Sequence, residues 1–148
     1  MDESIFFGSI KLKKVYLPLC LEVKNKCFLN NNSLEEINLD NCVLIGESAF
    51  TNSKLKEIEA NNCLRVGHQA FYNNTDLTNV KLEKCTDIGT GVFSRCSSLT
   101  SVYIPACRGL NNEVFAYSGL TEYENDKIFF LGDRVFYGCE QLKSVKLS

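Results

Sequence analysis

A leucine returns every 21 or 22 residues along almost the whole chain, and no other feature of the sequence limits the fold as strongly. Three and five residues after the leucine most units carry another apolar side chain, and sixteen residues after it each full unit carries a phenylalanine. The leucines are Leu12, Leu34, Leu55, Leu77, Leu99, Leu120 and Leu142, and the phenylalanines are Phe28, Phe50, Phe71, Phe93, Phe115 and Phe136. A period of this length is typical of solenoids, in which a unit buries its apolar positions only against neighbouring units.

The repeat divides the 148 residues into similar units that form a single domain, 1–148. We expect a partial unit at 1–11, full units that start near residues 12, 34, 55, 77, 99 and 120, and a final strand at 142–148. Phe7 precedes Leu12 by five residues, as Phe50 precedes Leu55, which places Phe7 in the phenylalanine column. The chain therefore opens inside a unit, and it is either this abrupt or one stretch of a longer array.

Each unit predicts one strand followed by turns. The pattern Leu-x-x-Ile-x-Leu, as in residues 34–40, alternates inward and outward positions and predicts a half-buried strand. A glycine that recurs after the next aliphatic residue, such as Gly46, indicates positive φ or close approach of the neighbouring coil. Six residues such as 47–52 are long enough for one helical turn. We therefore predict an α/β repeat with a parallel concave sheet and short turns or single helical turns on the convex side.

All eight cysteines fall in columns of the repeat, not in the short C-x-x-C pairs of metal sites. Five of them lie eight residues after the repeating leucine, where we expect the thiols to fill small buried slots and to donate weakly to the turn backbone. Disulfides between stacked neighbours are the alternative, because adjacent coils lie about 5 Å apart. His68 is the only histidine and is expected on the surface, so a cysteine nucleophile with a nearby base is not indicated.

The motif Leu-x-x-Ile-x-Leu-x-x-Cys-x-x-Ile-Gly-x-x-Ala-Phe resembles the BspA-like subclass of leucine-rich repeats, with cysteine where other members carry asparagine. The resemblance covers residues 7–148. It implies a right-handed solenoid and a kinship with surface or adhesion proteins of certain bacteria and protozoan parasites, and the asparagine and lysine usage fits a protozoan source. Lys24 in place of glycine, and Asn125 and Ile128 in the sixth unit, depart from the motif. We expect those units to be distorted or to act as partial caps.

The outward positions of the strands are the natural contact surface of a solenoid. The second, fourth and sixth positions after each leucine carry eight acids and three lysines, although the whole chain has a net charge of only −2. The sheet face is therefore predicted to be acidic and the remainder net positive, and Tyr16 and Tyr103 are its expected aromatic anchors. The predicted partner-binding residues are Tyr16, Glu36, Asn38, Asp40, Glu57, Glu59, Lys81, Glu83, Tyr103, Glu122, Glu124 and Asp126. An ordinary solvated sheet face also carries charges, and this is the alternative.

Other classes of function are not indicated. The nearly neutral charge argues against nucleic acid, and no apolar run of 18 residues predicts membrane insertion. Paired acids such as Glu57 and Glu59 lack a cleft that would desolvate one of them, so no enzyme activity, catalytic residue, metal or cofactor is predicted. The acidic N-terminus is not a secretory signal, and reduced cysteines favour a cytoplasmic location. Sequons at Asn31 and Asn73 would be exposed and could carry glycans if the protein were secreted.

The sequence thus predicts a non-enzymatic interaction module that binds a partner protein with a basic segment through an acidic concave face. The alternative is a fragment of a cell-surface adhesin that binds a host or matrix protein, in which case the location is the cell surface. Self-association through the open ends of the solenoid is a further expectation. Residues 128–131 form the most apolar run and predict a hydrophobic patch.

Overall fold

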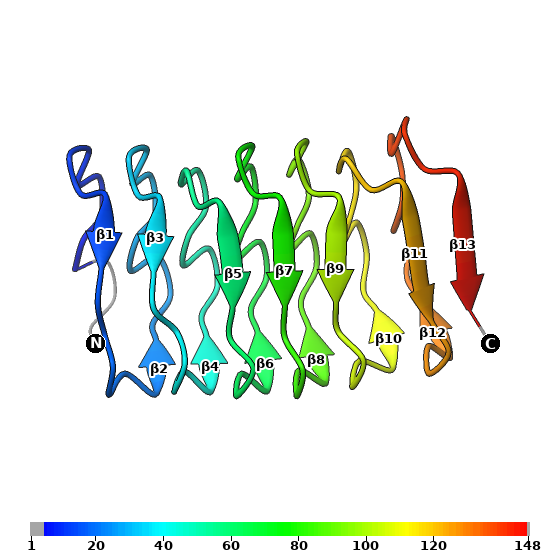
Figure 1. Ribbon diagram of the computed structural model, residues 1–148, viewed down its shortest axis with the longest axis horizontal. Helices are drawn as coiled ribbons and strands as arrows, with labels where there is room; N and C mark the ends of the chain where they lie inside the picture. The colour runs from blue at the N-terminus through cyan, green and yellow to red at the C-terminus, as the bar shows by residue number, and fades with distance from the viewer. Residues whose placement is uncertain (1–4, 148) are drawn as a thin grey trace.

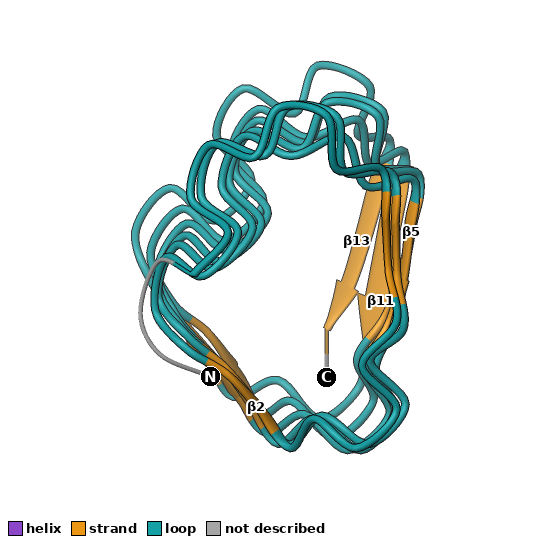
Figure 2. Cartoon of the chain, turned by 90° about the vertical axis from the view of Figure 1, so that its left-hand side faces the viewer, coloured by secondary structure: helices purple, strands orange, loops and turns teal. Residues whose placement is uncertain are grey.

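The computed structural model describes residues 5–147 as one column of stacked coils, with two short strands in each full coil (Figure 1). One strand of each coil belongs to the front ladder: β1 (Lys14–Val15), β3 (Glu36–Ile37), β5 (Glu57–Glu59), β7 (Asn79–Lys81), β9 (Ser101–Tyr103), β11 (Glu122–Asn125) and β13 (Ser144–Leu147). The other belongs to the second ladder: β2 (Glu22–Val23), β4 (Leu44–Ile45), β6 (Arg65–Val66), β8 (Asp87–Ile88), β10 (Gly109–Leu110) and β12 (Phe130–Leu131). Viewed along the column, the two ladders lie on different sides of the outline, with loops between them (Figure 2).

All strand pairs are parallel, and each residue pairs with its equivalent one coil later, as Val80 does with Val102. This confirms the predicted solenoid and places the predicted strand of every unit in the front ladder. The second ladder consists of strands that end at the aliphatic residue before the position of the recurrent glycine, as β4 does at Ile45. The sequence predicted only turns there. This ladder is continuous from β2 to β8 and continues as β10–β12, whereas the front ladder is divided into β1–β3, β5–β7–β9 and β11–β13.

The phenylalanines form a continuous stack in the interior, with centroids of consecutive rings 5.0 to 5.8 Å apart. The five fully buried members are Phe28, Phe50, Phe71, Phe93 and Phe115. Phe6 is the first member, because its ring stacks on Phe28 at 5.0 Å while Phe7 is 54% exposed. The assignment of Phe7 to this column was therefore wrong. The link from Phe6 to Leu12 has the five-residue length of most other links, and not the shorter length that was assumed.

Residues 5–147 contain no helix, so the predicted α/β class and the single helical turns are wrong. Each coil instead makes successive tight turns, in which two residues four apart adopt positive φ, such as Ser48 (53°) and Asn52 (59°). Left-handed residues interrupt a right-handed helix. Every second amide of this segment bonds to the neighbouring coil, as the Phe50 N–H does to the Ala70 carbonyl at 2.8 Å, while the Ala49 and Thr51 amides donate to carbonyls three residues earlier. The alternate amides are therefore unavailable for the unbroken run of bonds that a helix requires.

The recurrent glycines are explained by the close approach of neighbouring coils. A Cβ atom on Gly67 would lie 2.6 Å from the backbone nitrogen of Glu47, and one on Gly89 would lie 2.6 Å from that of His68. Residues with a side chain cannot occupy such positions without moving the backbone. Of the two explanations offered by the sequence, close approach is confirmed, and the positive φ angles occur elsewhere in the coil.

All eight cysteines are free thiols, so the alternative of disulfides between stacked coils is not realised. The cysteines that lie eight residues after a repeating leucine donate to the carbonyl two residues later, as Cys42 Sγ does to the Leu44 carbonyl at 3.2 Å. Burial raises the pKa of the Cys42 thiol to about 11. In the sixth unit Asn125 stands near this turn, and its Nδ2 donates to the carbonyls of Ile104 and Cys107 at 3.0 and 3.3 Å. The amide of the unit that departs from the motif therefore supports the turn of the preceding coil.

Candidate functional site

The outward side chains of the front strands and of the residues just after them form one surface, which we call the front face. All the predicted partner-binding residues lie on this face and are exposed or half-buried, with Tyr16 and Tyr103 exposed by 75% and 53%. The structure distributes these residues along the row of coils and does not gather them into one pocket. The electrostatic pattern along the row therefore decides where a partner can bind.

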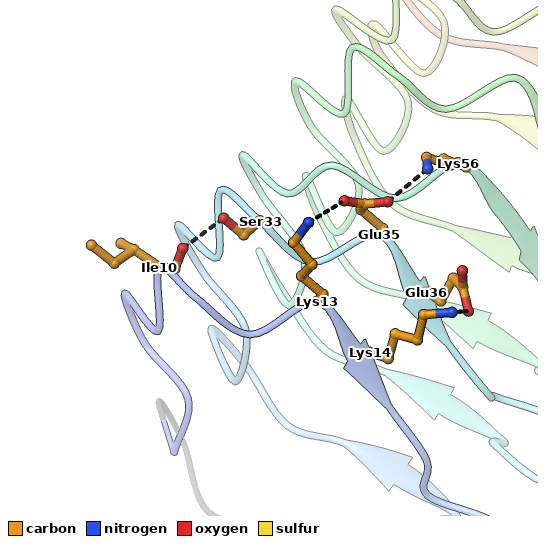
Figure 3. A network of polar contacts seen from close by, with 7 residues as sticks. All are labelled: Ile10, Lys13, Lys14, Ser33, Glu35, Glu36 and Lys56. Carbon is orange, nitrogen blue, oxygen red and sulfur yellow. Dashed lines mark hydrogen bonds and ion pairs between the residues drawn. The ribbon is translucent and has the colours of Figure 1, made fainter.

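At the N-terminal end of the front face, ion pairs join neighbouring coils (Figure 3). Lys14 Nζ lies 2.8 Å from the Glu36 carboxylate, and this hydrogen bond raises the pKa of Lys14. At the edge of the face, Glu35 accepts a hydrogen bond from Lys56 at 2.6 Å and lies 3.5 Å from Lys13, so both cations lower the pKa of Glu35. Exposed ion pairs of this kind add little to the stability of a fold, and their main effect here is on the charge pattern.

The other two lysines of the front face also pair with its acids. Lys81 lies 3.3 Å from both Glu83 and Glu59, and Lys146 lies 2.5 Å from Glu124. Hydrogen bonds to these carboxylates raise the pKa of both lysines. The lysines of the face are thus engaged with neighbouring carboxylates and leave its excess of acids uncompensated.

Glu57 and Glu122 are among the acids of the front face that have no cationic side chain within 4.0 Å among residues 5–147. Both are exposed, and both stand two residues after a repeating leucine, at the first position of β5 and of β11. The two residues are therefore equivalent members of one column. Their carboxylates are accessible to a cation from another molecule.

Within residues 5–147 the front ladder opens at two places. Strand β3 does not pair with β5, and β9 does not pair with β11. Figure 1 shows the strands on either side of each gap farther apart than the front strands that do pair. We call the gap between β3 and β5 the first opening and the gap between β9 and β11 the second opening. A depression of about 490 Å³ lies at the first opening, and depressions of about 260 and 360 Å³ lie at the second. The front face is therefore hollowed where the sequence analysis assumed that it offers no cleft.

Both openings follow a link that is one residue shorter than the others. The links 51–54 and 116–119 place four residues between a phenylalanine and the next leucine, whereas the remaining links place five. Each front strand that follows a five-residue link pairs with the strand before it, and each that follows a four-residue link does not. A missing residue removes about 3.3 Å of reach, and we attribute the loss of strand pairing to this shortening.

The buried side chain three residues after the phenylalanine also differs between the two kinds of link. In long links it donates to the phenylalanine carbonyl of the preceding coil, as Asn74 Nδ2 does to Phe50 at 2.8 Å and Cys96 Sγ does to Phe71 at 3.2 Å. In the first short link this position is Ser53, whose buried Oγ has no hydrogen-bond partner among residues 5–147. A four-residue link with serine at this position is thus the sequence signal that could have located the openings.

At each opening the inward aliphatic side chain of the preceding strand becomes accessible. Ile37 and Val102 are half-buried, whereas their equivalents Ile58 and Val80 are exposed by only 1% and 0%. Ile37 lines the depression at the first opening, and Val102 lines both depressions at the second. Sequence reasoning missed these two residues because every residue of this column was assigned to the core.

All the predicted binding residues except Lys81 and Glu83 line the depressions at the two openings. Their glutamates are Glu36, Glu57 and Glu59 at the first opening, where Glu35 also lies, and Glu122 and Glu124 at the second. Tyr16, which lies one coil before β3, lines the depression at the first opening, and Tyr103 on β9 lines one of the depressions at the second. Each opening therefore combines an apolar floor, carboxylates on the following strand and one exposed tyrosine.

The asparagines of the sequons are not exposed as expected. Asn31 is fully buried, and its Nδ2 donates to the Phe6 carbonyl at 2.5 Å. Asn73 is half-buried, and its Nδ2 donates to Asn52 Oδ1 at 2.8 Å. A glycan attaches through this amide nitrogen. The expectation of an exposed Asn31 is wrong, because the link asparagine turns inward to satisfy a backbone carbonyl of the preceding coil.

The rest of the described chain offers exposed polar and apolar side chains but no metal site. No group of three or more His, Cys, Asp or Glu side chains in residues 5–147 could hold a metal ion, and no helix there is long and apolar enough to cross a membrane. His68 is exposed, as predicted, and its Nδ1 accepts a hydrogen bond from the Thr90 N–H at 2.9 Å. In the apolar run 128–131, Phe129 is 79% exposed while Ile128 is buried in the core.

Three solved structures share the fold. A leucine-rich cell surface protein from Faecalibacterium prausnitzii superposes with a TM-score of 0.79 at 24% identity, over 98% of this chain and 41% of that protein. Pneumococcal vaccine antigen PcpA superposes with a TM-score of 0.60 at 13% identity, over 93% of this chain and 51% of that protein. A leucine-rich repeat protein from Bacteroides ovatus superposes with a TM-score of 0.52 at 17% identity, over 100% of this chain and 64% of that protein. The chain thus spans less than two thirds of each of these proteins. All three are bacterial, so they lend no support to the expected protozoan source.

No curated protein matches the chain in sequence. The family described as the BspA type leucine rich repeat region matches residues 1–121 and 111–148, with six copies of the repeat. This match covers the coils of the column and agrees with the resemblance found in the repeated motif. The leucine, cysteine and phenylalanine columns that carried the resemblance are the columns that fill the core. The chain belongs to the family of BspA-type leucine-rich repeat proteins.

Proposed function

We propose that the chain is a non-enzymatic protein-interaction module whose front face binds a basic segment of a partner protein. The observation that carries this proposal is the charge of the front face, where eight acids stand against three lysines in outward positions. The lysines are engaged with neighbouring acids, and Glu57 and Glu122 find no cation among residues 5–147. A basic segment would supply the missing positive charge.

Two further features support a protein partner. Tyr16 and Tyr103 are exposed aromatic side chains on an otherwise polar face, and such residues contribute strongly to binding energy in interfaces. The excess of negative charge would steer a basic partner toward the face and would make association depend on salt. A lysine-rich or arginine-rich segment in an extended conformation fits a surface that is long and shallow.

A segment of a cell-surface adhesin that binds a host or matrix protein is the second candidate. The observation in its favour is that a solved structure of the same fold is a cell surface protein, of which this chain covers 41%. The chain would then be one stretch of a longer array at the cell surface. Eight free thiols are instead typical of a reducing compartment, which is the basis of the cytoplasmic prediction. Surface biotinylation of intact cells, followed by blotting for the protein, separates the two locations.

The proposal includes no catalytic step. A carboxyl group that acts as a general acid is normally buried so that its pKa rises toward neutrality. Glu57 and Glu59 on β5, like Glu122 and Glu124 on β11, are exposed to solvent. The front face therefore offers charge and shape for binding, without the desolvation that acid–base catalysis requires.

The test uses a fluorescent peptide that contains four arginines in a serine–glycine background, with binding to the 148-residue chain followed by anisotropy. A peptide with glutamates in place of the arginines measures non-specific binding. The front-face variant is Glu57→Lys/Glu59→Lys/Glu124→Lys, and the control variant is Glu47→Lys/Asp133→Lys/Glu140→Lys. The control makes the same change of charge at exposed positions outside the front face.

We expect the wild-type chain and the control variant to bind the arginine peptide, and the front-face variant to bind it at least about tenfold more weakly. Binding by the wild-type chain should weaken as salt is raised. The melting temperature of the front-face variant should change little, because exposed charges contribute only about 0–1 kcal/mol each. Equal binding by the two variants would contradict the proposal.

A further inference from the structure

We propose that the first and second openings are two equivalent pockets for arginine side chains, and that one extended segment of the partner fills both. This inference rests on the proposed function, since it states where on the front face the basic segment binds. It concerns the gaps between β3 and β5 and between β9 and β11, which the family motif does not mark.

The two openings share one construction. Each follows a four-residue link, each has a half-buried aliphatic floor, and each has glutamates two and four residues after the leucine of the following unit. The floors are Ile37 and Val102, and the first glutamates are Glu57 and Glu122. The openings lie three units apart along the column. Two occurrences of the same arrangement indicate two sites for the same kind of side chain.

The chemistry of each opening fits arginine. The apolar stem of the side chain would lie on Ile37 or Val102, and the guanidinium group would reach the carboxylates of the following strand. The first of these, Glu57 or Glu122, has no cationic side chain within 4.0 Å among residues 5–147, although Lys56 lines the first opening and Lys146 the second. Exposed tyrosine rings at Tyr16 and Tyr103 line the openings and offer a face on which a planar guanidinium stacks. Lysine matches the charge but not the stacking or the bidentate geometry.

The distance between the openings sets the spacing of the two arginines. Three coils at about 4.8 Å each separate the openings by about 15 Å, and an extended peptide advances about 3.3 Å per residue. Side chains of an extended segment alternate, so only even separations present both arginines to the same face. The arginines should therefore be four or six residues apart. The residues between them pass over Lys81 and its neighbours on β7, which favours uncharged side chains there.

The test uses synthetic peptides that carry two arginines separated by two, four, six, eight or twelve residues in a serine–glycine–threonine background. All have the same charge, so a diffuse electrostatic attraction predicts the same affinity for each. If one segment fills both openings, affinity for the wild-type chain should peak at a separation of four or six, about tenfold above the peptides with separations of two and twelve. Lysine peptides of the same spacing should bind more weakly.

Two variants that each remove one negative charge complete the experiment. Glu122→Gln removes an acid of the second opening, whereas Glu140→Gln removes an exposed acid outside the front face that lines neither opening. We expect the binding optimum at a separation of four or six residues to be lost in Glu122→Gln and retained in Glu140→Gln. Arginine peptides that bind with no optimum of spacing would overturn the two-pocket inference and leave the proposed function in place. If the four-arginine peptide also fails to bind, the proposed function itself is overturned.

Discussion

Phe50 and Phe71 lie face to face in the core, with ring centroids 5.3 Å apart and ring planes inclined by 6°. Each ring belongs to a different coil, and both are fully buried. The same contact recurs from Phe6 to Phe136, so the stack joins successive coils through offset aromatic packing. In a column without a globular core, contacts between neighbouring coils are the main source of stability.

Replacing Phe71 by alanine should lower the free energy of unfolding by roughly 3–5 kcal/mol, because it removes a large ring from the middle of the stack. Urea denaturation followed by circular dichroism measures the change. Phe129→Ala is the matched control, since Phe129 is 79% exposed and its loss should change stability by at most about 0.5 kcal/mol. A loss below about 1 kcal/mol for Phe71→Ala would show that the stack is not the main support of the column.

Asn74→Ala should destabilise the chain by about 0.5–1.5 kcal/mol, because it removes the side-chain donor to the buried Phe50 carbonyl and leaves this carbonyl only the Ser53 N–H at 3.2 Å. Asn74→Cys should cost less, since Cys96 occupies the same position in the next unit and donates its thiol to the Phe71 carbonyl at 3.2 Å. Thermal unfolding of the two variants measures the difference. Equal losses would show that a thiol does not replace the amide donor at this position.

Replacing the short link 51–54 by the sequence of the long link 72–76 should close the first opening. The added residue restores the reach that other units have, so β5 should pair with β3. Hydrogen exchange measured by mass spectrometry should show slower exchange for the amides of residues 57–60 and no change in β9. Unchanged exchange in this segment would show that the length of the link does not cause the opening.

Alkylation of the folded chain by iodoacetamide should be slow at most cysteines. Burial raises the pKa of Cys42 to about 11 and that of Cys96 to about 12, so little thiolate is present at neutral pH. Cys20 and Cys139 are only half-buried and should react first. Peptide mapping after timed labelling, with a urea-denatured sample as reference, tests this order. Rapid labelling of Cys96 in the native chain would contradict the buried column.

The raised pKa of the buried Cys42 thiol also predicts how the stability of the chain depends on pH. The pKa of Cys42 is higher in the folded chain than in the unfolded chain, so the unfolded thiol releases its proton first as pH rises. Its contribution to stability is fully present below about pH 8.5, the ordinary pKa of a thiol, and declines as pH rises from there to about 11. Urea denaturation between pH 8 and 11 should show this decline, with a smaller slope for Cys42→Ala. Identical slopes would exclude the thiol as a cause.

The sequence predicted the parallel solenoid and the content of its core correctly, and the reason is the repeat itself. A side chain at one position packs against its own equivalent in the next coil, so a column such as Ile58 and Val80 can be recognised from spacing alone. The helical turns were wrong for a different reason. The length of 47–52 allows a turn of helix, but alternate amides of this segment, such as that of Phe50, bond to the next coil.

What the sequence by itself determined is thus the set of equivalent positions: which residues stack, which face outward, and that the outward row is acidic. Only the tertiary structure decided how neighbouring coils meet. The two links that are one residue short look like ordinary variation in the chain, yet they coincide with unpaired strands and with the exposure of Ile37 and Val102. The physical reason is that periodicity records contacts between equivalent residues, whereas strand pairing depends on the path that each link takes through space.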